Sequence, residues 1–442
     1  MDTVDALMIT LILVSEQQRA ADEPLQIVDM TTGTKRDEPP FETLRPTTLH
    51  VFGFEPIGGH GGMVLYDLAF FNSLVRQGLE VTWVTCDETR VEPEGFQRWT
   101  PFRGIYEGPS WRRGIRYIRG LYALLQRANQ LAKRQRVIIH QQFVTLPIAE
   151  LAFVNLARWQ GIPCVLTVHD VTPYVGVAAA RMRRLLPRLY GQYDALIVHS
   201  KAAQAELKDL VDQPAPPIYV IPHGHYNDSH GDGPNLPQSE ARARLGVSNS
   251  ARVILFLGGI RREKGLEYLL RALPDVLRLL PDTVLIVAGR PYQHEASSYE
   301  NLIDALNVRN HVRLRWEFVP DDELPTYYRA ADVATVPYTK AYQSGVCLTA
   351  YAFRRPVVAS AIGGLQEQVI DGKTGYLVPP ANPSAIAQAL ISILSRPGQA
   401  EIMGQLGHDW AADVCGWEKI AVQTIQIYDQ TWRSRRHTGG DN

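Results

Sequence analysis

Cysteine is scarce in this chain of 442 residues, and its four cysteines are scattered. Because none stands in a C-x-x-C pair, neither a disulfide framework nor a zinc knuckle is expected, and a reducing, cytoplasmic compartment is the natural setting. Charge of one sign is lacking too, since 45 Lys and Arg balance 46 Asp and Glu to a formal net charge of -1. This balance implies no partner that binds the whole surface electrostatically. The cysteines are Cys86, Cys164, Cys347 and Cys415.

Long hydrophobic runs are also missing. No apolar stretch reaches the ~18 residues that a membrane-spanning helix needs. The short apolar run at residues 6–14 is preceded by Asp2 and Asp5 instead of Lys or Arg, which argues against a signal peptide. The rest of residues 1–46 is polar, so we expect a disordered N-terminal extension.

Length and composition favour two globular domains. The chain is longer than the about 250–300 residues at which a single core stops growing. Its 45% hydrophobic and 21% charged residues are ordinary for a globular protein. Glycines and prolines cluster at residues 231–237 and indicate a linker. The expected division is a first domain at 47–222, a linker at 223–250, a second domain at 251–415 and a C-terminal helix and tail at 416–442.

Residues 332–380 organise the second half of the chain. Two runs in this stretch, 332–336 and 356–359, are rich in Val and Ala and indicate buried strands of a parallel sheet. A helical segment follows each run, and the same alternation recurs elsewhere, so the sequence predicts an α/β fold with doubly wound parallel sheets. The other predicted strands are 48–54, 80–85, 137–140, 164–168, 195–199, 218–222, 253–257, 283–288 and 312–316.

Both helical segments in this stretch begin at small residues. Ser344-Gly345 opens an apolar helix that includes Val346, and Gly363-Gly364 opens the next one. The first N–H groups of a helix and its dipole favour an anion, and a glycine lets the ligand approach the backbone. We therefore expect phosphate-binding positions at the carboxyl edge of this sheet.

Two earlier loops add glycines and cations to the same predicted edge. The loop after strand 253–257 contains Gly259, Arg261 and Lys264, and a helix with leucines at helical spacing follows it. Strand 283–288 ends in Gly289. The cations suit an anionic ligand, although solvated loop charges would look the same.

The first half opens as a nucleotide-type fold. Strand 48–54 is followed by a glycine-rich loop with Gly61-Gly62, a helix and strand 80–85. There is no G-x-G-x-x-G spacing, so a dinucleotide is not favoured, and the glycines also suit a tight turn. Strand 164–168 ends in His169-Asp170, at the edge where such sheets bind ligands.

The motifs of the second half carry a family resemblance. Pro337-Tyr338, then SGV, then PVVAS..GG..E.V.DG.TG.LV.P resembles the donor half of glycosyltransferase family 4, and the resemblance extends from about Thr48 to Tyr428. It implies the GT-B architecture, in which two Rossmann-like domains face a central cleft. It also implies a retaining enzyme that moves a sugar from a nucleotide-diphosphate sugar to an acceptor hydroxyl, without metal or cofactor, in polysaccharide, glycolipid or other glycoconjugate synthesis.

The resemblance also assigns roles to residues. Lys264 and Arg261 would bind the donor pyrophosphate, with Gly259 at the family's usual arginine position, and His169 would lie near the sugar. Glu367 lies in the last motif, is not one of the family's pair of glutamates, and is expected to bind substrate. The remaining positions expected to bind substrate are Gly61, Gly62, Asp170, Gly289, Val319, Ser344, Gly345, Val346, Thr349 and Gly364, with Val319 at the turn that meets the base.

One departure from the family pattern concerns two glutamates. The family's pair, eight residues apart, would fall at Ala341 and Thr349, and neither residue is acidic. The missing acids normally face the sugar and the ribose. The hydroxyl groups of Thr349 and Ser344 are candidates to replace them.

Residues 111–136 form a basic segment with eight Arg or Lys and no acid, interleaved with Trp, Ile, Tyr and Leu. This composition is typical of an amphipathic helix on an anionic membrane surface, and equally of a solvated helix face. Residues 181–186 repeat the theme. No nucleic-acid-binding motif accompanies the charge. A peripheral position at the inner face of the membrane, next to a lipid-linked acceptor, is thus one expectation.

Other functions on the same fold stay open. A phosphorylase would carry pyridoxal phosphate on a lysine, and a sugar-nucleotide epimerase would convert the donor without an acceptor. The missing glutamates also allow a non-catalytic sugar-nucleotide-binding subunit. His223, His225 and His230 lack the carboxylate or cysteine that a known metal-ligand spacing needs, so no metal is expected.

Overall fold

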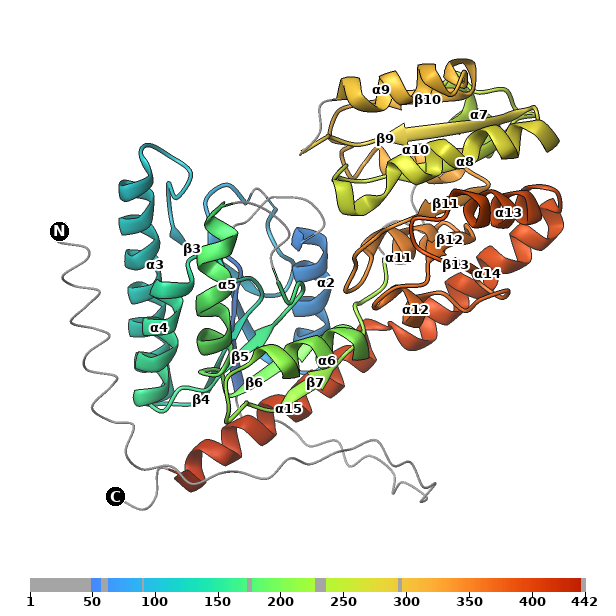
Figure 1. Ribbon diagram of the computed structural model, residues 1–442. Coiled ribbons are helices and arrows are strands. Elements are labelled where there is room, and N and C mark those ends of the chain that lie inside the picture. The colour runs from blue at the N-terminus through green and yellow to red at the C-terminus, as the bar shows by residue number, and fades with distance from the viewer. Residues whose placement is uncertain are drawn as a thin grey trace, which may run out of the picture. The chain divides into compact units, whose positions relative to one another are not determined.

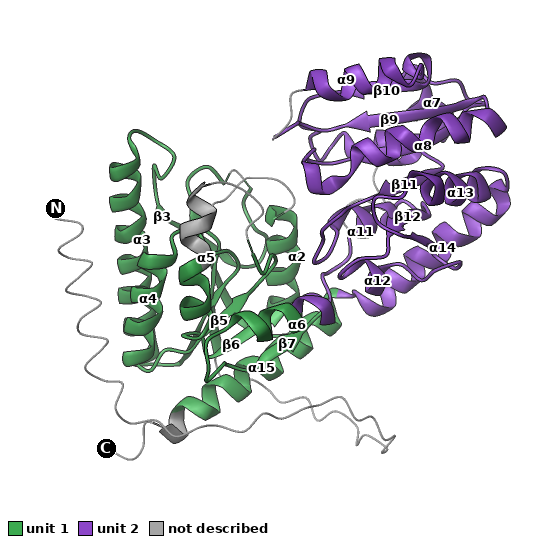
Figure 2. Cartoon of the chain, viewed as in Figure 1, with its two compact units in different colours: residues 1–198, 204–221, 417–442 green, residues 199–203, 222–416 purple. Residues whose placement is uncertain are grey.

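The computed structural model describes residues 49–56, 63–89, 91–172, 177–226, 236–292 and 296–438. The chain forms two compact units (Figure 2). Unit 1 contains the described residues up to Val198, then Gln204–Ile221 and the chain from Trp417 onward, and unit 2 contains His199–Ala203 and Pro222–Gly416. The expected N-terminal extension and the glycine pair Gly61-Gly62 lie outside the described residues.

Unit 1 contains a seven-stranded sheet in the order β3-β2-β1-β4-β5-β6-β7, in which all paired strands are parallel. Val51 at its centre pairs with Val81 on one side and Ile138 on the other. Such apolar neighbours are expected in a parallel sheet covered on both faces. The strands are β1 (Leu49–Phe54), β2 (Glu80–Cys86), β3 (Gln97–Phe102), β4 (Arg136–Gln141), β5 (Cys164–Thr167), β6 (Ala195–Val198) and β7 (Ile218–Val220).

Helices cover both faces of this sheet (Figure 1). On one face α2 and the C-terminal helix α15 share a core with the strands, in which Phe70 lies near Trp417. On the other face Phe54 and Phe102 pack toward α4 and α3 through Phe153 and Tyr117. The helices that belong mainly to unit 1 are α2 (Met63–Arg76), α3 (Ser110–Ala132), α4 (Pro147–Trp159), α5 (Val177–Tyr190), α6 (Lys201–Leu210) and α15 (Trp417–Thr438).

Unit 2 contains a six-stranded sheet in the order β10-β9-β8-β11-β12-β13, again with parallel pairs only. The strands are β8 (Arg252–Leu257), β9 (Thr283–Ala288), β10 (Val312–Arg315), β11 (Val333–Val336), β12 (Val357–Ser360) and β13 (Gly375–Val378). The helices are α7 (Gln238–Arg244), α8 (Leu266–Leu279), α9 (Ala296–Ala305), α10 (Leu324–Ala330), α11 (Gly345–Ala352), α12 (Leu365–Gln368), α13 (Pro383–Leu394) and α14 (Pro397–Val414), with 3-10 turns at Arg262–Lys264 and Arg309–His311.

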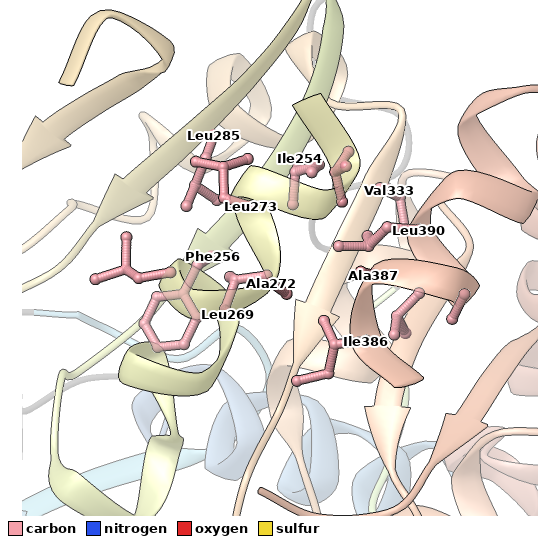
Figure 3. Packing of buried hydrophobic residues seen from close by; sticks show 14 of the residues in the cluster. Ile254, Phe256, Leu269, Ala272, Leu273, Leu285, Val333, Ile386, Ala387 and Leu390 are labelled. Carbon is pink, nitrogen blue, oxygen red and sulfur yellow. The ribbon is translucent and has the colours of Figure 1, made fainter. Parts of the chain in front are cut away.

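The core of unit 2 lies between this sheet and helices α8 and α13 (Figure 3). Ile254 and Phe256, two residues apart on β8, both belong to it, as the period of a strand requires. Leu269, Leu273 and Leu390 from the helices are almost completely buried against them. This packing fixes β8, and with it the loop that follows.

Both sheets therefore share the strand order 3-2-1-4-5-6 once their strands are renumbered, and unit 1 adds a seventh strand, β7, beyond the sixth. In this order the chain leaves the central pair of strands in opposite directions, which opens a crevice at their carboxyl ends where ligands bind. The central pair is β1 and β4 in unit 1, and β8 and β11 in unit 2. The predicted doubly wound parallel sheets are thus present.

Some elements differ from the sequence expectations. The segment expected as a linker contains α7, and β3, α9 and α14 were not predicted. The basic helix α3 ends at Ala132, and Arg136 already belongs to β4. The expected helix after Gly364 is a single turn, α12. The C-terminal helix expected within 416–442 takes up most of that range, from Trp417 to Thr438.

Candidate functional site

The loop after β8 meets the loop after β11 at the crevice of unit 2. Lys264 lies in the 3-10 turn Arg262–Lys264, and its Nζ lies 3.7 Å from the centroid of the Tyr338 ring. Tyr338 comes two residues after the end of β11. The ring face attracts the ammonium group and so holds a positive charge at the end of the central strands.

Gly265 explains why these two loops lie so close together. Its φ is +67°, and a Cβ there would lie 2.0 Å from the carbonyl oxygen of Pro337. Only glycine fits this position, because a side chain would collide with the backbone. The glycine after Lys264 therefore fixes the distance between the two loops and does not itself leave room for a ligand.

The first turn of α11 provides a helix N-terminus beside this charge. The Ser344 Oγ accepts a hydrogen bond from the Cys347 backbone N–H at 3.4 Å, and so caps the helix. Gly258, with φ +127°, would place a Cβ 3.7 Å from Val346. A Cβ on Gly345 would lie 3.6 Å from the ring and hydroxyl of Tyr226. Gly258, Gly345, Val346 and Lys264 therefore share one edge of unit 2.

Arg261 and Gly289 both make contacts with neighbouring residues of unit 2. An Nη1 of Arg261 lies 3.7 Å from the Glu263 carboxylate, which offsets part of its charge. Gly289 has φ +150°, and a Cβ there would lie 1.9 Å from the carbonyl oxygen of Gly258. The loops after β8 and β9 pack backbone to backbone at this glycine.

Gly363 and Gly364 also serve close packing. A Cβ on Gly364 would lie 1.9 Å from the Tyr342 carbonyl oxygen, and one on Gly363 would lie 2.0 Å from the Ala341 carbonyl oxygen. The Ser200 Oγ donates to the same Tyr342 oxygen at 2.8 Å. Since α12 is only four residues long, this opening is explained by backbone contact within unit 2.

The Glu367 carboxylate is occupied as well. Within unit 2 it accepts hydrogen bonds from the backbone N–H groups of Lys201 at 3.1 Å and Ala202 at 3.2 Å. These groups open helix α6, so Glu367 satisfies donors that the helix itself leaves open. The carboxylate also complements the positive end of that helix dipole.

The two hydroxyl groups considered as substitutes for the glutamate pair have partners inside α11. The Thr349 Oγ1 donates to the Gly345 carbonyl oxygen at 2.9 Å, so the hydroxyl proton is used in a hydrogen bond within α11. Ser344 is 4% exposed and caps the helix. Its backbone is held by Gln368, whose Oε1 accepts from the Ser344 N–H at 2.8 Å. The aromatic residues Tyr226 and Tyr338, which lie at the edge instead, were missed as site residues.

Val319 is the last of the unit 2 positions. It follows β10 and is 6% exposed, whereas its neighbour Phe318 is 54% exposed. The turn therefore exposes Phe318 to solvent, whereas Val319 is buried.

In unit 1, His169 lies just beyond β5 and is 7% exposed. Its ring packs edge-on against Tyr66 at a centroid distance of 5.0 Å, and Asp170 beside it is exposed. His140 on β4 is fully buried, and its ring nitrogens contact the Tyr428 hydroxyl and, at 2.8 Å, the Thr167 Oγ1. Burial lowers the pKa of His140 to about 3, so this histidine is neutral.

Buried acids also mark the edge of unit 1. Asp67 on α2 is fully buried and Glu55, next after β1, is 3% exposed. Burial, and then the neighbouring Glu55 charge, raise the pKa of Asp67 well above its usual value. Burial and a neighbouring carboxyl group therefore both disfavour the ionised form of Asp67. Neither residue was predicted as a site residue, because an isolated acid in a loop or helix has the sequence signature of a solvated charge.

Glu150 on α4 is the third buried acid. Its Oε1 accepts hydrogen bonds from the Tyr117 hydroxyl of α3 and from the Thr145 N–H at 2.8 Å. Burial raises the pKa of Glu150 to about 7, although these hydrogen bonds favour the ionised form. Glu150 thus joins α3 to the turn after β4.

The described residues contain neither a cluster of metal ligands nor a membrane-spanning helix. Among them no group of three or more His, Cys, Asp or Glu could hold a metal ion. None of the helices in the described parts of the chain is long and apolar enough to cross a membrane.

Two families match the chain. Residues 60–225 match the family described as Glycosyltransferase Family 4, and residues 237–410 match the family described as Glycosyl transferases group 1. These ranges correspond to much of unit 1 and much of unit 2, respectively.

Curated relatives cover most of the chain. It is 33% identical over 386 residues to a GDP-mannose-dependent alpha-(1-6)-phosphatidylinositol monomannoside mannosyltransferase of Mycolicibacterium smegmatis, covering 83% of this chain and 94% of that protein. It is 28% identical over 408 residues to a D-inositol 3-phosphate glycosyltransferase of Kineococcus radiotolerans, covering 86% and 92%.

Solved structures share the fold. Anabaena HepE in complex with UDP and glucose superimposes with a TM-score of 0.68 at 18% identity, over 87% of this chain and 100% of that chain. Sucrose-phosphate synthase from Thermosynechococcus elongatus gives a TM-score of 0.66 at 22% identity, over 88% and 100%. The predicted GT-B fold class is confirmed.

Proposed function

Because the chain belongs to the glycosyltransferases of family 4 (group 1) and is a glycosyltransferase of the GT-B type, we propose that it is a retaining nucleotide-sugar hexosyltransferase. One observation carries the donor assignment: Lys264 and the N-terminus of α11 lie together at the crevice of unit 2. The UDP bound by the structural neighbour supports a nucleoside-diphosphate donor.

The chemistry asks for charge rather than for a general base. When the bond between the sugar and the diphosphate breaks, the sugar gains oxocarbenium character and negative charge grows on the leaving phosphate. Lys264, the half-exposed Arg261 and the first-turn N–H groups of α11 are fixed before the reaction, so they stabilise that charge with little reorganisation. Each residue acts within unit 2.

The acceptor hydroxyl is proposed to bind at the edge of unit 1. His169 and Asp170 follow β5 there, and the neutral His140 and the buried carboxyl groups of Glu55 and Asp67 belong to the same unit. The relatives named for inositol phosphate and phosphatidylinositol monomannoside support a polyol or sugar hydroxyl, free or linked to a lipid. Glycoconjugate synthesis is therefore the proposed role.

Helix α3 supports a lipid-linked acceptor in particular. Trp111 is 61% exposed and Tyr122 is 63% exposed, and Ile118 lies between them on the same outward side. Arg112 and Arg119 are exposed beside this apolar stripe. Exposed aromatic rings with flanking arginines suit the interface of an anionic bilayer, where each basic residue contributes roughly 1 kcal/mol. We propose peripheral binding at the cytoplasmic face.

The structure divides the arginines of α3 into two classes. Arg113 donates to the Ile105 carbonyl at 3.1 Å, and Arg116 donates to the carbonyls of Gly104 at 2.6 Å and Glu107 at 2.8 Å. These two hold the turn before the helix. Leu121, an apolar residue of the basic segment, is 3% exposed and belongs to the core instead of the outward stripe.

Vesicle flotation tests the membrane proposal with matched charge changes. The double variant Arg112→Gln/Arg119→Gln should leave anionic vesicles, while Arg271→Gln/Arg278→Gln, which loses the same charge from α8, should stay bound. High salt should release the wild-type protein. Wild-type protein that stays soluble with anionic vesicles at low salt contradicts the proposal.

A thermal-shift panel of UDP-, GDP- and ADP-sugars tests the function itself. A donor at ~100 times its Kd should stabilise the protein by about 2.7 kcal/mol. Donor cleavage that needs an acceptor supports a transferase, whereas conversion of the donor alone indicates an epimerase. Binding without cleavage indicates a non-catalytic subunit, and absorbance from pyridoxal phosphate indicates a phosphorylase.

A further inference from the structure

Two strands of unit 2 end at large exposed aromatic rings. Tyr292, after β9, is 60% exposed, and Phe318, after β10, is 54% exposed. Among the described residues of unit 2, the other large hydrophobic side chains that are exposed are aliphatic. Their position is what makes these two rings notable, because both follow strands at the edge of the sheet where such folds bind ligands.

Tyr292 is held in place by its backbone. Its N–H donates to the Ile260 carbonyl at 3.0 Å, and the Ile260 N–H donates to the Arg290 carbonyl at 2.9 Å. Ile260 and Pro291 form a parallel bridge. The segment after β9 is therefore attached to the loop after β8, the loop that carries Lys264.

The ring of Tyr292 lies against Gly259. A Cβ on Gly259 would come within 3.0 Å of the Tyr292 Cε2 and 3.5 Å of its Cδ2. One part of the ring thus covers a residue without a side chain, while most of the ring stays open to solvent. The Arg290 guanidinium lies 5.9 Å from the ring centroid.

The order of the strands gives this ring its place relative to the donor. The diphosphate is proposed to lie between the ends of β8 and β11, and β9 and β10 follow β8 outward on the other side. A nucleoside attached to that diphosphate extends either toward β9 and β10 or toward β12. Toward β12 the space beside Gly363 and Gly364 is occupied by backbone carbonyl oxygens. Toward β9 the Tyr292 ring is exposed.

We propose that Tyr292 is a stacking platform for the nucleobase of the donor. The inference rests on the proposed function. It adds a residue that contacts the base of the donor and does not contact the diphosphate. A π-face accepts any base, so Tyr292 contributes to affinity for several nucleotides. Phe318, at the end of the neighbouring strand, supplies a second apolar surface that favours the better-fitting base.

Calorimetric titration of UDP, GDP and ADP into the whole 442-residue chain tests the platform. Tyr292→Ala should weaken the best nucleoside diphosphate by about tenfold or more, as loss of one aromatic–base stack does. Tyr292→Phe keeps the π-face and should stay within about twofold. Ile402→Ala, which shortens an equally exposed side chain on α14, is the matched control.

Inorganic pyrophosphate, measured by competition, separates the base from the phosphates. Its inhibition constant should be unchanged in Tyr292→Ala, because the ring does not contact the phosphates. An unchanged nucleotide affinity in Tyr292→Ala, or an equal loss for pyrophosphate, overturns the platform while leaving the donor site intact. Wild-type protein that binds none of the three nucleotides overturns the proposed function and the platform together.

Discussion

The two units share a strand order but differ in what they place at the carboxyl edge of the sheet. Unit 2 offers a fixed positive charge, Lys264, a helix N-terminus and exposed aromatic rings. Unit 1 instead has buried carboxyl groups, those of Glu55, Asp67 and Glu150. The shared topology therefore selects where a ligand binds, and the side chains select which ligand.

This difference argues for a division of labour. A diphosphate needs permanent cations and N–H donors, which the edge of unit 2 has. Buried carboxyl groups would repel a diphosphate whenever they ionise, so the edge of unit 1 suits the neutral hydroxyl groups of an acceptor. Four substitutions test this division.

Lys264→Ala should have the largest effect on catalysis. Removing a charge aimed at the leaving group should lower kcat/KM by roughly 10²–10³-fold, with the fold unchanged. Steady-state kinetics with the donor found by thermal shift, beside circular dichroism, measures both. Activity within a factor of two of wild type would remove Lys264 from the donor site.

Gly364→Ala should destabilise unit 2 by roughly 3 kcal/mol, since its Cβ would lie 1.9 Å from the Tyr342 carbonyl oxygen. Gly372→Ala is the control for an added methyl group, because a Cβ there meets nothing within 4 Å, although its φ of +69° carries its own strain. Urea unfolding compares the two. Normal stability with lost donor binding would return Gly364 to a ligand-binding role.

Glu150 should make stability depend on pH. Burial raises its pKa in the folded protein from the ordinary value of 4.5 to about 7, so the folded state binds the extra proton. Its contribution is fully present below pH 4.5 and is lost as the pH rises through about 7, by up to about 3 kcal/mol. Glu150→Gln keeps an acceptor for Thr145 and should flatten that fall.

Chemical unfolding at several pH values between 4.5 and 8 measures the Glu150 contribution. The difference between wild type and Glu150→Gln matters, because other groups titrate in both proteins. His223, whose pKa burial lowers to about 4, has the opposite sign and loses stability as the pH falls. A pH-independent difference between the two proteins would mean that Glu150 stays ionised.

His169→Ala should give the smallest effect, a fall in turnover of about tenfold with donor affinity unchanged. The ring lies at the edge of unit 1 against Tyr66, so its loss should not reach the donor contacts of unit 2. His169→Gln, of similar size, separates packing from chemistry. Equal turnover in wild type and both variants would make His169 a packing residue.

Much of the fold could be predicted from sequence because buried parallel strands are continuous apolar runs. The run at 283–288 matches β9 residue for residue. The edge strand β3, with sequence QRWTPF, has no such run, since only one of its residues is buried. Helix α14 was missed for a similar reason, as its Gly404 and Gly407 suggest a loop but pack against Arg354 and Tyr351.

The site was predictable only where a motif carries the chemistry. Lys264 before a glycine has a recognisable pattern, and the structure places it at the crevice. The glycine pair Gly363-Gly364 has one too, yet its glycines are required by backbone packing, which a sequence does not distinguish from ligand approach. Glu55 and Asp67 are twelve residues apart and have no pattern, since only folding brings a helix over its strand.

Amide hydrogen exchange with and without the best-binding nucleoside diphosphate tests the division of labour most directly. Exchange slows where a ligand holds backbone N–H groups or stabilises their surroundings. The division predicts new protection at residues 258–264 and 344–346 of unit 2, and none at residues 49–55 and 164–170 of unit 1. Protection confined to the unit 1 segments would contradict it, and would place the nucleotide at the edge with the buried acids.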